Sequence, residues 1–151
     1  MIQRVARPFL LLCLTALFSG CSDSGIVPVS GTVLMDAEPL LLEGFIRVEP
    51  TDGRAATGKI NPQDGSFSLT TFSQNDGCMP GTHAVSVIVN KTIGMNTVSM
   101  VPEKYLSSET SELTVTIDGP TDALSIQLTG GITDIPENAP SPPDEGDLYL
   151  K

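Results

Sequence analysis

The stretch GKINPQDGSFSLTTF, Gly58 to Phe72, sets an acidic residue beside a glycine at the head of a run that alternates apolar and hydroxyl side chains. Phe67 and Leu69 alternate with serines and threonine, which is the period of a strand with one buried face. Asp64-Gly65 is a pair that supplies the positive φ angles of a tight hairpin. The stretch therefore predicts a hairpin turn at Asp64, followed by a strand whose apolar residues enter a core.

Similar strand patterns recur along the middle of the chain. Apolar residues alternate with polar ones in 113–117 and 124–128, and β-branched residues are frequent in 27–34 and 44–49. In 83–90 both sets of alternating positions are mostly apolar, so this strand is expected to be central and covered on both faces.

Turn signals separate these strands, and no long stretch between them has apolar residues at the spacing of an amphipathic helix. The turns are Asp52-Gly53, Asp64-Gly65, Asp76-Gly77 and Asp118-Gly119. Short strands with turns every 8–12 residues or so indicate an antiparallel sandwich or barrel. We expect an all-β fold, a single antiparallel β-sandwich of about seven strands, with at most a helical turn within 103–112.

The N-terminus has the three parts of a secretory signal peptide: Arg4 and Arg7, an uncharged run at 9–18, and small residues before Cys21. The apolar run is shorter than the roughly 20 residues that a membrane-spanning helix needs. The sequence Phe18-Ser19-Gly20-Cys21 resembles the bacterial lipobox, with phenylalanine where leucine is usual. The resemblance implies that residues 1–20 are removed and that Cys21 carries lipid; ordinary cleavage or a retained hydrophobic anchor are the alternatives.

The remaining boundaries follow from composition. Residues 21–26 form a short lipidated tether, residues 27–131 the β-sandwich domain, and residues 132–151 a mostly disordered tail rich in proline and acidic residues. Ser22 replaces the aspartate that marks inner-membrane retention in some bacteria, which favours the outer membrane of the cell envelope. The domain would then face water while the lipid holds it at a membrane.

The charge of the processed chain excludes nucleic acid as a partner. Removing residues 1–20 takes Arg4 and Arg7 from the eight basic residues, so six remain against 18 acidic ones, a formal charge of −12. Such a surface repels phosphate backbones.

Among the cysteines, Cys13 leaves with the signal peptide and Cys21 carries lipid, so Cys78 has no partner for an internal disulfide. We interpret Cys78 as a small buried apolar residue, with a reactive thiol as the alternative.

Several motifs resemble a known family in order and spacing. The matching residues are Val29-x-Gly31-x-Val33, Glu38-Pro39-Leu40, Gly58 before Asp64-Gly65-x-Phe67, Pro80-Gly81 and Pro102-x-x-Tyr105. Together, across roughly 27–128, they resemble small bacterial envelope lipoproteins related to carboxypeptidase regulatory-like domains, a group similar in fold to transthyretin. The resemblance implies a prealbumin/Ig-like sandwich and supplies no activity, because the regulatory-like domain is an accessory unit in enzymes. Cys78 departs from the small apolar residues usual at its position.

The sequence gives little support to catalysis. His83 is the only histidine, and no G-x-S-x-G motif is present. His83 shares the period of the valines that follow it, so we expect it to cap a strand or to lie at a core edge, and not to act as a base. Transthyretin-like enzymes that hydrolyse 5-hydroxyisourate use several histidines and end in Tyr-Arg-Gly-Ser, whereas this chain ends DLYLK. We therefore predict no enzyme and assign no catalytic residue.

Metal and glycan binding are weaker alternatives. Pro62 and Ile60 stand where a helix-loop-helix calcium loop needs oxygen ligands before Asp64, although calcium could still bind between loops. The atom types that copper prefers occur in Cys78, Met79, His83, Met95 and Met100, but a blue-copper centre needs two histidines. For glycan binding, the chain contains no tryptophan on which a sugar ring could stack, and Tyr105 is the only tyrosine within the expected domain.

These observations predict a non-enzymatic, lipid-anchored β-sandwich of the cell envelope that acts as a structural or protein-interaction module, without a cofactor or a metal. Its contacts with an envelope protein would come from loops such as 94–111 and from free strand edges. The alternative is a ligand-binding module for glycan or calcium.

Overall fold

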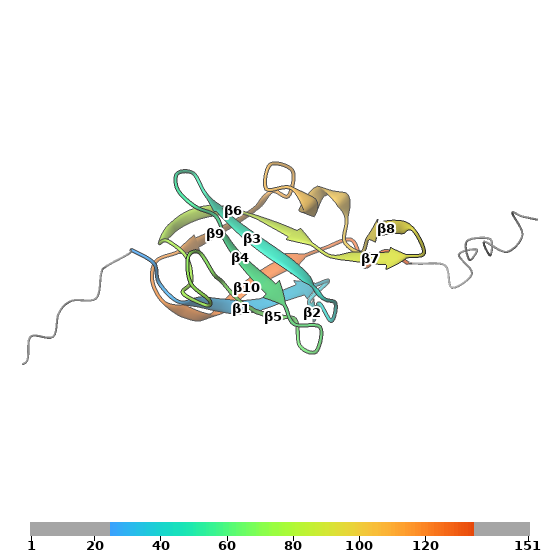
Figure 1. Ribbon diagram of the computed structural model, residues 1–151, viewed down its shortest axis with the longest axis horizontal. Coiled ribbons are helices and arrows are strands. Elements are labelled where there is room, and N and C mark those ends of the chain that lie inside the picture. The colour runs from blue at the N-terminus through green and yellow to red at the C-terminus, as the bar shows by residue number, and fades with distance from the viewer. Residues whose placement is uncertain (1–24, 135–151) are drawn as a thin grey trace, which may run out of the picture.

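β-Strands dominate residues 25–134, the part of the chain that the computed structural model describes (Figure 1). The elements, in chain order, are β1 (Val29–Met35), β2 (Glu38–Pro39), β3 (Gly44–Pro50), β4 (Ala56–Ile60), β5 (Ser66–Ser68), β6 (Gly81–Ile88), β7 (Asn90–Ile93), β8 (Asn96–Ser99), the 3₁₀ turn η1 (Glu103–Leu106), β9 (Leu113–Ile117) and β10 (Thr121–Leu128). The all-β prediction is confirmed, and η1 is the helical turn expected within 103–112. The signal peptide, Cys21 and most of the C-terminal tail lie outside the described residues.

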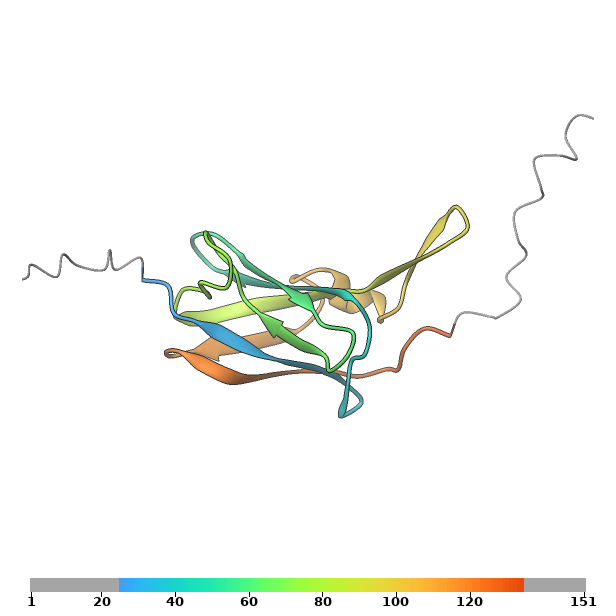
Figure 2. The same ribbon diagram turned by 60° about the horizontal axis from the view of Figure 1, so that its bottom comes forward.

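Two four-stranded sheets and one separate hairpin make up the structure (Figures 1 and 2). The first sheet is antiparallel, in the order β4-β3-β6-β9. In the second, β1 pairs with β10 along one edge and with β5 and β2 along the other. β7 and β8 pair with each other. The position of β6 between β3 and β9 confirms that it is an interior strand.

One strand pair departs from the antiparallel prediction: β1 and β10 run parallel, from Val29↔Thr121 to Met35↔Leu128. They are the first and last long strands of the described chain, so no short hairpin joins them and fixes their relative direction. The described residues also contain ten strands, not about seven, because two-residue β2 and the hairpin strands β7 and β8 have no counterpart in the expectation.

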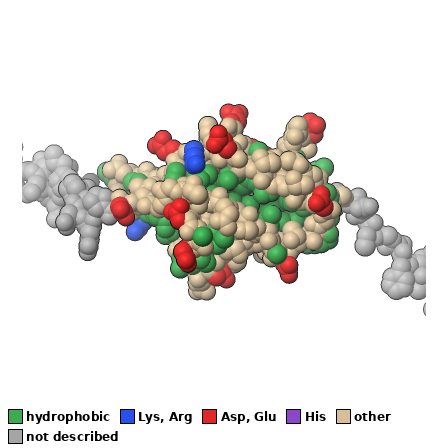
Figure 3. Space-filling model, turned by 180° about the vertical axis from the view of Figure 1, so that it is seen from behind, with side chains coloured by type: hydrophobic (Ala, Val, Ile, Leu, Met, Phe, Trp, Pro, Cys, Tyr) green, Lys and Arg blue, Asp and Glu red, His purple; other side chains and the backbone are tan. Residues whose placement is uncertain are grey.

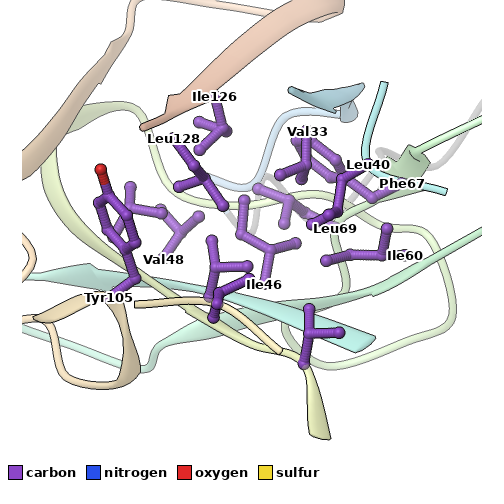
Figure 4. Close-up of a cluster of buried hydrophobic side chains, with 14 of the residues drawn as sticks. Val33, Leu40, Ile46, Val48, Ile60, Phe67, Leu69, Tyr105, Ile126 and Leu128 are labelled. Carbon is purple, nitrogen blue, oxygen red and sulfur yellow. The ribbon is translucent and has the colours of Figure 1, made fainter. Parts of the chain in front are cut away.

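Apolar side chains of both four-stranded sheets meet in one core (Figure 4). Burial alternates strictly along β1 and β4, as the period-2 pattern requires. Val33 and Leu128, from the sheet of β1, and Ile46 and Ile60, from the sheet of β3, are all at 2% exposure or less. Burying one such side chain contributes about 1.5–3 kcal/mol, so the core supplies most of the driving force that joins the two sheets.

The Asp-Gly turns connect sheets more often than they close hairpins. Asp52-Gly53 joins β3 to its partner β4, but the other three pairs lie on connections from one four-stranded sheet to the other. At Asp64-Gly65 the expected hairpin is therefore only local: Asn61 and Thr57 each bond across the turn, to Ser66 and Thr70. β5 itself pairs with β1, because this pairing places Phe67 and Leu69 in the shared core.

The described chain begins at one end of an elongated body and leaves it at the other (Figures 1 and 2). Val27 bridges to Cys78 near the starting end. The β7–β8 hairpin projects from the opposite end, where the amide N–H of Thr133 donates to the carbonyl oxygen of Met100 (3.0 Å). Because the two ends lie apart, a tether before residue 25 would leave the surface of the β7–β8 hairpin accessible.

Candidate interaction surfaces

Most residues of the β7–β8 hairpin are exposed. Ile93 pairs with Asn96, so Gly94 and Met95 form a two-residue loop, and Gly94 has the positive φ (60°) that such loops need. Met95 is 92% exposed at this tip. At the base, the amide N–H of Met100 donates to the carbonyl oxygen of Val89 (2.7 Å), and both residues are buried. The core thus holds the base of the hairpin while the tip presents a flexible apolar side chain.

A shallow hollow of about 360 Å³ lies at the foot of this hairpin. Its lining residues are Glu43, Gly44, Phe45, Ile88, Asn90, Lys91 and Thr92. Phe45, the second residue of β3, is 54% exposed on the outer face of its sheet, next to Ile88 in register. The hairpin and this hollow, which we together call the hairpin surface, expose Phe45 and Met95 among mostly polar side chains. Exposed apolar side chains rimmed by polar residues are a feature of interaction sites.

The segment after the hairpin covers the outer face of β6 and is held by hydrogen bonds. Ser111 donates to the carbonyl oxygen of Val85, and Ser108 donates to Glu49, which also pairs with Arg47. These contacts, first that with Ser108 and then that with Arg47, lower the pKa of Glu49. The part of the expected contact loop 94–111 that follows the hairpin is therefore fastened to the sheet, and the hairpin tip is its free part.

Tyr105 is a structural residue and not a glycan platform. Its side chain is 3% exposed, and the amide N–H of Thr129 donates to its hydroxyl oxygen (2.9 Å). The ring therefore ties η1 to the end of β10 (Figure 4). Its position leaves no open ring face on which a sugar could stack.

Cys78 is buried, as predicted, and His83, which was expected to cap a strand or lie at the edge of the core, is buried as well. Cys78 is 3% exposed, and burial raises the pKa of its thiol to about 11, which makes the thiolate scarce. His83 is also 3% exposed and donates its Nε2–H to the carbonyl oxygen of Met79 (2.8 Å). Its Nδ1 is buried without a hydrogen-bond partner among the described residues. Within residues 25–134 no hydroxyl, thiol or carboxylate lies within hydrogen-bonding reach of this imidazole.

The carboxylates of the turns bond to the backbone. Asp64 accepts from the amide N–H of Ser66 (2.9 Å), and contacts with Ser66 lower its pKa. Asp76 accepts from the amides of Thr71 (2.7 Å), Phe72 (3.0 Å) and Ser73 (2.8 Å), which likewise lower its pKa. Both side chains therefore shape turns.

The structure does not gather the residues considered for metals. Met95 lies at the hairpin tip, whereas Cys78, Met79 and His83 lie near the opposite end, beside Val27. Within the described range 25–134, no three histidine, cysteine or acidic side chains are grouped as metal ligands would be. Acidic side chains are scattered over the face seen in Figure 3.

Sequence reasoning missed one surface feature, in which Arg54 lies over the ring of Phe72 at 5.4 Å from the ring centroid. Phe72 is 62% exposed. The two residues are 18 positions apart, and the Thr57–Thr70 bridge brings them together. The alternation that places Phe67 and Leu69 in the core puts Phe72 on the opposite, outward face, and this was the one available signal.

In comparisons with known proteins, no family model, no curated protein and no solved structure matches the chain. Among residues 25–134, no helix has the length and apolar character to cross a membrane.

Proposed function

We propose that this protein is a non-enzymatic, lipid-anchored module of the bacterial cell envelope that binds another envelope protein through its hairpin surface. The observation that carries the proposal is the placement of the exposed β7–β8 hairpin at the end of the body opposite the start of the described chain (Figure 1). A lipid on Cys21 would hold the starting end at the membrane. The hairpin would then point away from the membrane, toward a partner.

The proposed anchor keeps the domain close to the membrane. From Cys21 to Val27 a fully extended chain spans at most about 20 Å, because each residue adds roughly 3.3–3.6 Å. Two or more acyl chains give durable attachment, since each buried methylene contributes about 0.8 kcal/mol. The localisation that we propose is the outer membrane, with the β-rich body facing water.

We also propose that the body is a single sandwich of the prealbumin type, related to carboxypeptidase regulatory-like domains. Its seven strands would be β1, β3, β4, β5, β6, β9 and β10. The shared core of the two four-stranded sheets supports this assignment, and the parallel β1–β10 pair is a variation on it.

The partner contact is tested by photocrosslinking in cells. A photoreactive amino acid at Met95 should give a recurrent protein adduct, because this side chain is 92% exposed at the hairpin tip. The control places the same group at Asp118, an exposed residue at the other end of the body, near Pro28.

A partner that recurs at position 95 and not at 118 supports the hairpin surface. If position 95 gives no recurrent adduct, or both positions give the same set, the hairpin contact is rejected. Identification of the adduct by mass spectrometry names the partner in the first case.

A further inference from the structure

A second surface pocket, of about 380 Å³, lies beside Arg54 and Phe72. Its lining residues are Arg47, Arg54, Ala55, Thr57, Thr70, Thr71 and Phe72. The loop that contains Phe72 continues to Gly77, which contacts Val27, so the pocket lies toward the end of the body where the described chain begins. Arg47 lies two residues from Phe45 on the same outer face of β3, so the pocket borders the hollow of the hairpin surface and extends from it toward that end.

The residues that line this pocket are basic or uncharged, although the carboxylates of Glu49 and Asp76 lie close by. Two of its lining residues are arginines and none is acidic, in a sequence with a formal charge of −10. Arg47 pairs with Glu49, but among residues 25–134 Arg54 forms no ion pair. Arg54 therefore presents an uncompensated guanidinium beside an exposed ring, and guanidinium groups recognise carboxylates through paired hydrogen bonds.

The backbone amides of the neighbouring loop already donate hydrogen bonds to a carboxylate of the same chain. The amides of Thr71, Phe72 and Ser73 converge on the carboxylate of Asp76. A phosphate group would seek such converging amides, and here they are occupied. The donors that remain are the planar guanidinium of Arg54 and the hydroxyl groups of Thr57 and Thr70, of which that of Thr70 also accepts from the amide N–H of Asn75 (2.9 Å). These groups favour a planar carboxylate among neutral hydroxyl groups.

We propose that this pocket binds a carboxylate-bearing sugar, a uronic acid residue of a polysaccharide. The carboxylate pairs with Arg54, with Arg47 beside it, and the apolar face of the sugar ring packs on the exposed part of the Phe72 ring that Arg54 does not cover. The hydroxyl groups of Thr57 and Thr70 bond to ring hydroxyls. This site goes beyond the proposed partner contact and depends on neither the hairpin nor the lipid anchor.

Calorimetric titration of the purified protein tests the site. The probes are oligogalacturonate and the same oligosaccharide with its carboxyl groups methyl-esterified, which keeps the rings and removes the charge. We expect saturable binding of the acid, at least tenfold weaker binding of the ester, and a loss of at least tenfold for Arg54→Ala and for Phe72→Ala. Both residues are exposed, so thermal melting should show that the variants remain folded.

The matched control is Lys104→Ala, which removes one positive charge from an exposed position on η1, outside both pockets. This variant should bind the acid with the affinity of the unchanged protein. The proposal is overturned by absence of binding, by equal affinity for acid and ester, by equal weakening in the Lys104 variant, or by preference for a peptide with a free terminal carboxylate over the sugar.

Discussion

Gly65 and Asp64 occupy one turn but contribute to it differently. Gly65 has a φ of 73°, and a Cβ atom there would lie 2.9 Å from the carbonyl oxygen of Val33 and 3.0 Å from the amide nitrogen of Leu40. Asp64 has no such backbone constraint and accepts a single hydrogen bond, from the amide of Ser66. The glycine therefore fixes the path of the chain, and the aspartate assists it.

Gly65→Val should lower the free energy of unfolding by about 2–4 kcal/mol, because a β-branched residue is strained at positive φ and has no space here. Asp64→Asn should leave the urea midpoint nearly unchanged, since asparagine forms the same turns. Urea denaturation followed by circular dichroism measures both. Equal midpoints for the two variants would contradict this account of the turn.

Asp76 should contribute stability that depends on pH. Three backbone amides, with that of Thr71 the strongest contributor, hold its pKa below the ordinary 3.8. A carboxylate with a lowered pKa in the folded state stabilises the fold above its unfolded pKa, and this contribution is lost as pH falls through the folded pKa. We expect Asp76→Asn to lower the urea midpoint at pH 7. The midpoints of the variant and of the unchanged protein should converge as pH falls below 3.8.

The control for this effect is Asp52→Asn, because the Asp52 carboxylate accepts no hydrogen bond among the described residues. Its midpoint should follow that of the unchanged protein at every pH. A constant difference between the Asp76 variant and the unchanged protein, from pH 7 down to pH 2, would refute the assigned role of the carboxylate.

At the scale of elements, β1 depends on a glycine for its parallel pairing. A Cβ atom on Gly31 would lie 1.9 Å from the carbonyl oxygen of Leu124 in β10. The register of the β1–β10 pair shifts between Val29 and Gly31, so the two backbones approach closely at this point. Any side chain there would separate the first strand from the last.

Gly31→Ala should lower the free energy of unfolding by more than about 3 kcal/mol, because the clash is with backbone and cannot be relieved by a rotamer change. Gly119→Ala is the matched control: nothing lies within 4 Å of its Cβ position, and we expect a change within about 0.5 kcal/mol. Thermal unfolding of both variants measures the difference. A Gly31 variant as stable as the Gly119 variant would contradict the close approach.

The sequence predicts strands better than it predicts their partners. Alternation places Phe67 and Leu69 correctly in the core, because the pattern depends only on which face of one strand is buried. The choice of partner is decided by the shared core, as in β5, which pairs with β1 and not with β4 across the turn. Local pattern contains no information on that choice.

The candidate surfaces were predictable to different degrees. The range 94–111 includes the exposed Met95, but the expected loop did not reveal that Asn90–Ile93 and Asn96–Ser99 pair as a projecting hairpin. The pocket beside Arg54 and Phe72 depends on a bridge between distant residues, so no local motif could indicate it. The burial of Cys78 was predictable because a lone thiol usually behaves as a small apolar residue, whereas His83 is more buried than its expected place at a strand cap or core edge.

At the scale of the whole molecule, Cys78 reports on unfolding of the shared core. Its raised pKa, about 11, and its 3% exposure should make a thiol reagent at pH 8 react at least about 100-fold more slowly than with the urea-unfolded chain. The reactivity should rise with urea at the midpoint seen by circular dichroism, if both sheets unfold together. Reactivity that appears well below that midpoint would show that the region around Cys78 opens separately.

The lipid anchor is the central claim, and incorporation of radiolabelled palmitate in growing cells tests it most directly. The unchanged protein and a Cys13→Ala variant, which alters only the segment expected to be removed, should both carry label and sediment with membranes. Cys21→Ala should carry none and lose its membrane attachment. Label that persists in the Cys21 variant, or that is absent from the unchanged protein, would contradict the account.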